Sequence, residues 1–155
     1  MSTAGLATAS ANNFLALEPL LADLLRQALQ GMRPAVQVLT AADLADVKLT
    51  RQHAPAVHLV YGGYRLEDDA GARLLLAHTW HAVTVVRNVA SARTGQDARQ
   101  DAGPLLERVM SALLGAHLKG ATHPLKLAQP PRPWHEAGTQ FIPTTVVVKT
   151  VFHKT

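Results

Sequence analysis

Two long strand-like runs, residues 56–61 and residues 73–88, constrain the fold more than any other feature of the sequence. Both are rich in β-branched and aromatic residues, which fit the half-buried surface of a sheet. Two adjacent glycines, residues 62–63, interrupt the first run and predict a bulge before it continues through Arg65. The acidic segment 67–71 ends in glycine and predicts a turn, so the two runs are expected to form an antiparallel hairpin.

Alternation along the second run divides its side chains between the two faces of the predicted sheet. One face would carry Trp80, Ala82, Thr84 and Val86, and the other His81, Val83, Val85 and Arg87. A valine-rich run, residues 141–153, predicts another long strand, and residues 36–38 and 125–127 predict two brief ones. Residues 40–47 have the cap pattern of a short helical turn.

Two segments have the leucine spacing of three and four residues that is typical of amphipathic helices. The first covers residues 14–30, where Pro19 leaves two possible starts: Phe14, or Glu18 after a separate turn. The second covers residues 98–114. The order is helix, strand, helical turn, two strands in a hairpin, helix, loop and strand, which predicts an α+β fold with helices packed on one sheet.

The chain has 155 residues, the size of one ordinary domain, and 48% of them are hydrophobic. Residues 1–13 are mostly small or polar, and we expect a flexible N-terminal tail there and a single domain over residues 14–155. Residues 116–139 contain five prolines and glycines before Gly138, which leaves little room for regular structure. A loop of this length is usually either functional or disordered.

Positive charge is concentrated in the last third of the chain. Residues 1–107 hold nine basic and ten acidic residues, whereas the rest holds six basic residues and one acid, a net charge of +5. Such a region can dock on an acidic protein surface or on phosphate, and a solvated face explains it equally well. The six basic residues are Arg108, Lys119, Lys126, Arg132, Lys149 and Lys154.

The sequence has no signature of catalysis, of a cofactor site or of a metal site. The absence of cysteine excludes disulfides and thiolate chemistry. Its eight histidines lack the spacing of metal ligands, and His78 and His81 would lie on opposite faces of a strand. No serine stands in a nucleophile motif, and there is no phosphate-binding glycine loop. We therefore predict no catalytic, cofactor-binding or metal-binding residues, and no enzyme activity.

Neither a membrane span nor export is expected. No apolar run reaches 18 residues, and the N-terminus lacks the charged start and apolar run of a signal peptide. Nucleic-acid binding has limited support, because the second predicted helix offers only Arg99 and Arg108, and aromatic residues make up 5% of the chain. Trp134, within the proline-rich segment 131–135, is expected to be an exposed aromatic anchor of a protein interface.

Three segments carry a resemblance to a known family. They are Pro55-Ala56-Val57-His58-Leu59-Val60-Tyr61-Gly62-Gly63-Tyr64, then Trp80-His81-Ala82-Val83-Thr84-Val85-Val86-Arg87-Asn88, then Ala102-Gly103-Pro104-Leu105-Leu106 with Leu113-Leu114-Gly115. In order and spacing the chain resembles the tail terminator (tail-completion) proteins of Mu-like phages and related tail-derived particles. The resemblance covers residues 17–152. It departs from the family at residues 116–139, where the family's loop is commonly tight and this one is long and basic.

The resemblance implies a structural protein with a mixed, mainly antiparallel sheet flanked by two main helices. Such proteins form a homo-hexameric ring on the head-proximal end of the tail tube, stop tube polymerisation and join the head-tail connector protein. The implied place is the virion tail, with assembly in the host cytoplasm and no specific nucleic-acid site, although DNA passes through the ring. A nucleic-acid-binding domain that uses the basic last third is the alternative function, and a small hydrolase is the third.

The expected interface residues follow from this role. Those at strand ends or in the following loop are expected in subunit contacts, and the basic residues and tryptophan of the long loop are expected to face the tube or a neighbour. We expect the basic residues of the long loop at the rim of the tube and not in the DNA channel, because a strongly basic channel would bind the phosphates of the passing DNA and slow it. The first group is Arg65, Arg87 and Arg93, and the second is Lys119, Lys126, Arg132 and Trp134.

Overall fold

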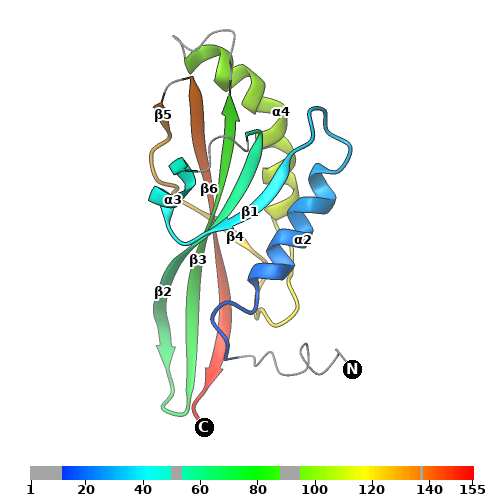
Figure 1. Ribbon diagram of the computed structural model, residues 1–155. Helices are drawn as coiled ribbons and strands as arrows, with labels where there is room; N and C mark the ends of the chain where they lie inside the picture. The colour runs from blue at the N-terminus through cyan, green and yellow to red at the C-terminus, as the bar shows by residue number, and fades with distance from the viewer. Residues whose placement is uncertain (1–11, 50–53, 88–94, 137) are drawn as a thin grey trace.

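Three long antiparallel strands form the centre of the fold (Figure 1). The computed structural model describes residues 12–49, 54–87, 95–136 and 138–155. The central strands are β2 (Ala56–Asp69), β3 (Arg73–Arg87) and β6 (Thr139–His153). Residues 1–11 of the expected tail, and Arg93, lie outside the described residues.

The hairpin between β2 and β3 is confirmed, but its turn is tighter than expected. The acidic residues 67–69 belong to β2, and the turn occupies residues 70–72. The amide of Ala70 donates to the carbonyl of Arg73 at 2.9 Å, and Gly71 has φ +80°. Glycine suits this backbone conformation because it has no Cβ.

Three short strands complete a mixed, mainly antiparallel sheet, as expected. Strand β1 (Gln37–Ala41) runs parallel to the first residues of β2, while β4 (Lys126–Ala128) and β5 (Trp134–Glu136) pair antiparallel with β6. The strand order is β1-β2-β3-β6-β4, with β5 also on β6. Strand β4 lies one residue beyond its predicted place, and β5 was not predicted.

Helix α2 (Glu18–Leu29) precedes the strands in the chain, α3 (Leu44–Leu49) lies between β1 and β2, and α4 (Gly95–Leu113) lies between β3 and β4. Helix α2 begins at Glu18 after a separate turn, because Pro19 is tolerated only in a first helical turn. Helix α3 is the expected short one, and the amide of Asp46 donates to the Asp43 carboxylate at 2.9 Å. Helix α4 begins three residues before its predicted start, within the segment read as loop.

Two hydrophobic clusters lie on opposite faces of the sheet, as the alternation of β3 predicted. The larger cluster joins α2 and α4 to the sheet, and the smaller joins α3 to it. Arg108 also ties the helices together, since it donates to the carbonyl of Ala28 at 3.3 Å. From β3, Trp80, Ala82 and Val86 belong to the larger cluster, whereas Val83 and Val85 belong to the smaller.

The lower parts of the three long strands project beyond α2 and α4 (Figure 1). We call this part the extension, and it consists of residues 64–69 of β2, 73–78 of β3 and 148–153 of β6. Two irregularities in the β2–β3 register mark it, one between Tyr61 and Tyr64 and one between Leu66 and Asp68. The first confirms the bulge that the paired glycines predicted.

Candidate interaction surface

The outer edge of β2 has no neighbouring strand along the extension. Strand β1 pairs only with the first five residues of β2, so residues 64–69 present an open side within the part of the chain that the structure describes. All six of these residues are exposed. We call residues 64–69 the β2 flank.

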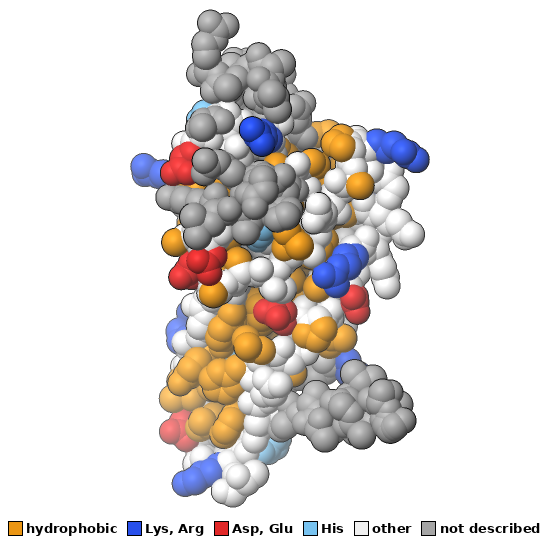
Figure 2. All heavy atoms as spheres, in the orientation of Figure 1, with side chains coloured by type: hydrophobic (Ala, Val, Ile, Leu, Met, Phe, Trp, Pro, Cys, Tyr) orange, Lys and Arg blue, Asp and Glu red, His pale blue; other side chains and the backbone are white. Residues whose placement is uncertain are grey.

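Two large apolar side chains of the β2 flank are about half exposed. Tyr64 exposes 56% of its surface and Leu66 exposes 49%. Tyr64 pairs in register with His78, and Leu66 pairs with Leu76. Figure 2 shows hydrophobic side chains gathered over the lower part of the molecule, where the extension lies. Half-exposed apolar residues next to an open strand edge are typical of a surface that binds another protein.

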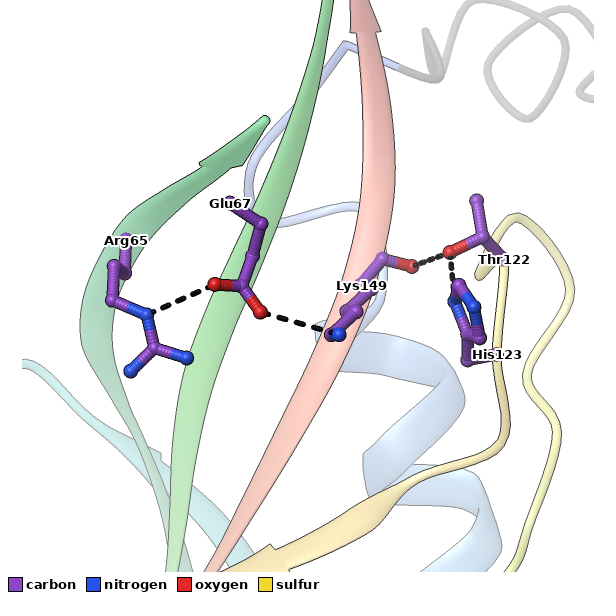
Figure 3. Close-up of polar contacts among 5 residues, drawn as sticks. All are labelled: Arg65, Glu67, Thr122, His123 and Lys149. Atoms are coloured by element: carbon purple, nitrogen blue, oxygen red, sulfur yellow. Dashed lines mark hydrogen bonds and ion pairs between the residues drawn. The ribbon is translucent and has the colours of Figure 1, made fainter. Parts of the chain in front are cut away.

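Glu67 lies at the second bulge, which turns its carboxylate toward β6. Its Oε2 accepts from Nε of Arg65 at 3.2 Å, and its Oε1 lies 3.2 Å from Nζ of Lys149 (Figure 3). Hydrogen bonds from Arg65 and then from Lys149 hold the pKa of the Glu67 carboxyl below its usual value. This three-residue bridge spans the extension from β2 to β6. The sequence could not reveal it, because the bridge depends on a one-residue shift in pairing.

The remaining acids of the β2 flank lie beside its turn. Asp69 accepts a hydrogen bond from the amide of Gly71 at 2.8 Å, and both Asp68 and Asp69 are exposed. With Arg65 and Glu67, these residues give the β2 flank a net charge of −2.

His78 anchors a buried polar chain across the extension. Its Nδ1 lies 2.7 Å from the hydroxyl of Tyr61, and its Nε2 lies 2.9 Å from the hydroxyl of Thr150. A neutral ring satisfies both bonds when Tyr61 donates to Nδ1 and Nε2–H donates to Thr150. Burial lowers the pKa of His78, which favours the neutral ring.

The residues before α2 cover this polar chain. The ring of Phe14 meets the rings of Tyr64, His78 and Phe152 edge-on, with centroids 5.0, 5.2 and 6.1 Å apart. Asn12 bonds the backbone of His153 twice, through its Nδ2 to the carbonyl and its Oδ1 to the amide. The start of the described chain is thereby fastened to the end of β6.

The opposite edge of the sheet, beside β6, carries two basic residues of the long loop. Lys119 and Lys126 are exposed, and Leu127 of β4 exposes 42% of its surface. Thr122 bonds the carbonyl of Lys149 through its amide at 2.8 Å and its hydroxyl at 3.2 Å (Figure 3), which holds this loop beside β6. We call residues 119–127 the β4 flank, and its two lysines give it a net charge of +2.

The structure does not gather the expected interface residues into one cluster. Arg65 pairs in register with Ala77, ten residues from Arg87 at the far end of β3. At about 3.3 Å per residue, these two arginines lie about 33 Å apart along the sheet. Lys119 and Lys126 share the β4 flank, whereas Arg132 and Trp134 lie beside α3, in a group described next.

Trp134 is half-buried, in contrast to the exposed anchor that was expected. It belongs to β5, and its ring stacks on Phe141 with centroids 5.0 Å apart and planes 7° from parallel. Its pairing with β6 explains the difference, since it places the indole against the smaller hydrophobic cluster. A hollow of about 400 Å³ lies beside it, lined by Leu44, Ala45, Pro131, Arg132 and Trp134.

The described part of the chain holds neither a cluster of metal ligands nor a membrane-spanning helix. In the parts of the chain that the structure describes, no three His, Asp or Glu side chains lie close enough together to hold a metal ion. None of the helices there has the length and hydropathy that a bilayer-spanning segment needs. The described surface presents two flanks of opposite charge, with two half-exposed apolar side chains on the β2 flank and one, Leu127, on the β4 flank.

The sequence matches the model of a known family. The model of a family described as "Phage tail terminator protein" matches residues 10–154, which is nearly the whole chain. No curated relative matches the sequence.

Proposed function

The chain belongs to the phage tail terminator family, and from this premise we propose that it caps the head-proximal end of the tail tube as a hexameric ring. Membership makes it a structural protein of the phage tail, located in the virion tail and in contact with other tail components. Beyond this, we propose that the ring stops polymerisation of the tube protein and presents the surface that joins the head-tail connector.

The family match over nearly the whole chain is the observation that carries this proposal. The surface of the described domain is compatible with this proposal, because the β2 flank and the β4 flank, at opposite edges of the sheet, differ in charge. A ring is built from head-to-tail contacts in which one surface of each subunit meets a different surface of the next. A domain with two unlike sides suits such contacts better than one with a single self-complementary patch.

We retain the expected interface residues as part of the proposal. The first group, three arginines, would contribute to contacts between subunits, and the second group, from residues 116–139, would face the tube rim or a neighbour. Assembly would take place in the host cytoplasm, with DNA later passing through a lumen that these residues do not line. The first group is Arg65, Arg87 and Arg93, and the second is Lys119, Lys126, Arg132 and Trp134.

Electron microscopy of tails made with and without this protein tests the proposal. We expect tubes of one length with a closed upper end when the protein is present, and overlong or ragged tubes when it is absent. A variant with Lys119, Lys126 and Arg132 each changed to glutamate should lose length control. Equal tube lengths with and without the protein would refute the capping function.

Nucleic-acid binding through the basic last third is the second candidate, favoured by its net charge of +5. In the structure these basic residues do not form one patch. Lys149 is paired with Glu67, and Arg108 bonds carbonyls at the end of α2. Arg132 lines the hollow beside Trp134, whose strand partner Phe141 lies about 40 Å along β6 from Lys154. Titration with duplex DNA at two salt concentrations would reveal this activity as a steeply salt-dependent affinity in the micromolar range or tighter.

A further inference from the structure

We propose that the β2 flank of one copy docks on the β4 flank of the next copy, and that this contact is the repeating interface of the ring. The proposal rests on the proposed ring function and identifies the surfaces that would build it. The two flanks are defined above as residues 64–69 and residues 119–127.

Charge supplies the first argument for a second copy as the occupant. The β2 flank carries a net charge of −2 and the β4 flank a net charge of +2. Glu67 already has two basic partners, so Asp68 and Asp69 are the carboxylates directed to a neighbour, and both are exposed. Lys119 and Lys126 are the matching exposed cations. Complementary charges of this kind fix the register of an interface and speed its formation.

Apolar surface supplies the second argument. Tyr64 and Leu66 expose about half of their surface on the β2 flank, and Leu127 does so on the β4 flank. These residues share one face of the sheet. Directly paired residues point to the same face of a sheet. Leu127 pairs with Val146, and Val146 pairs with Trp80 of β3. The β3 partners of Tyr64 and Leu66 are His78 and Leu76, which alternate along β3 on the same face as Trp80. Two copies placed side by side would therefore bring aromatic and aliphatic surfaces together on that face, as the centre of an interface requires.

The contact would be made by side chains and not by an added strand. The ladder of β2 is interrupted at residues 62–63 and again at Glu67, and β4 has only three residues. A bulge bends a strand and breaks its pairing, which protects an edge from continuous strand addition. The backbone of the β2 flank thus remains free while its side chains dock.

The position of the flanks allows a ring to close and prevents a copy from binding itself. Strands β3 and β6 separate β2 from β4, so the flanks are at least about 14 Å apart within one chain. The contact is heterologous, because the two surfaces are different, and it leaves one free flank at each end of any open chain of copies. Only a closed ring uses every flank.

A charge-swap experiment tests the pairing on tail tubes. Asp68→Lys with Asp69→Lys makes both flanks basic, and Lys119→Glu with Lys126→Glu makes both acidic. Each double variant alone should lose control of tube length, while an equal mixture should restore it, because copies of the two kinds can alternate around a ring with an even number of subunits. Circular dichroism and urea unfolding would establish that both variants fold. Loss of length control that the mixture does not repair would overturn the proposal.

Disulfide cross-linking gives a second readout that needs no activity. The chain has no cysteine, so Asp68→Cys with Lys126→Cys introduces the only two thiols. Their separation within one chain exceeds the reach of a disulfide, so oxidation can join only different copies. We expect a ladder of cross-linked species that ends at the hexamer. The matched control is Asp68→Cys with Glu107→Cys, which moves the second thiol to an exposed position on α4.

The two experiments separate this proposal from the capping function. If wild-type protein controls tube length but the paired variant gives no more cross-linking than the control, the flank contact is wrong and the function stands. If the ladder forms in concentrated protein but tube length is the same without the protein, the flank contact stands and the capping function is wrong. A ladder that ends at six on capped tubes supports both.

Discussion

Phe14 should contribute measurably to stability, because one side chain joins the residues before α2 to all three strands of the extension. Its ring meets Tyr64 of β2, His78 of β3 and Phe152 of β6 edge-on. Replacement by alanine removes all three contacts and uncovers the buried polar chain at His78. The two hydrogen bonds between Asn12 and the backbone of His153 would then hold the end of β6 without the neighbouring Phe14 ring packed beside them.

The expected size of the effect follows from the geometry. Edge-on aromatic pairs contribute about 0.5–1.5 kcal/mol each beyond the area they bury. Phe14 is only partly buried, so the low end of that range applies, and lost apolar burial adds about 1 kcal/mol. The sum, about 2–3 kcal/mol, is less than the 3–5 kcal/mol typical of deleting a fully buried phenylalanine. With a urea m-value of about 2 kcal/mol per M, the unfolding midpoint should fall by about 1–1.5 M.

Urea unfolding of the wild type and of Phe14→Ala measures this shift, with Leu15→Ala as the matched control. Leu15 is the next residue and exposes 48% of its surface, so its truncation should cost under about 0.5 kcal/mol. Hydrogen exchange adds a local readout, since the amide of His153 should exchange faster when Phe14 is lost. Equal midpoints for the two variants would show that the three ring contacts do not stabilise the extension.

Three further outcomes are expected. Trp80→Ala should lower the free energy of unfolding by about 3–5 kcal/mol, because Trp80 is buried; calorimetry should show Trp80→Phe to be milder. Gly62→Ala should cost about 1–3 kcal/mol, since its Cβ would lie 2.8 Å from Nε2 of His81, whereas Gly103→Ala, which meets nothing within 4 Å, should be neutral or stabilising in urea. Burial lowers the pKa values of His78 and His81 below the unfolded value of about 6.5, so the unfolded chain binds more protons in the range below that value. Stability should therefore decline as the pH falls from 7 toward 5, and urea midpoints should show a smaller decline for His78→Gln.

Local patterns in the sequence were sufficient to predict the long elements of this fold. Alternation in β3 assigned its side chains to the correct faces, and Gly62 with its neighbour marked a bulge that the register confirms. Strand β5 was missed because three of the five residues before Trp134 are prolines, which argue against a strand in the local sequence. The strand forms because it pairs with β6, which is distant in the chain. The turn after β2 was placed too early, because charge suggested a loop where hydrogen bonding continues the strand.

The candidate surface was only partly accessible from the sequence. The sequence predicted Arg65, Lys119 and Lys126 as interface residues, but it could not place them at opposite edges of one sheet. Nothing local links Glu67 to Lys149, which lies 82 residues later; their contact depends on a one-residue bulge and on the order of strands. Surfaces built from distant segments follow from topology, and topology is set by tertiary packing.

Strand β6 has a consequence for how the molecule is made. It is the last of the described strands to leave the ribosome, yet β3, β4 and β5 all pair with it. Until residues 139–153 have been synthesised, the β3 side of the hairpin is a second bare edge, and β4 and β5 have no strand to pair with. Nascent chains at this stage are the form most exposed to chaperones and to aggregation, so rare codons just upstream of β6 should lower the yield of assembled protein more than the same codons before α2.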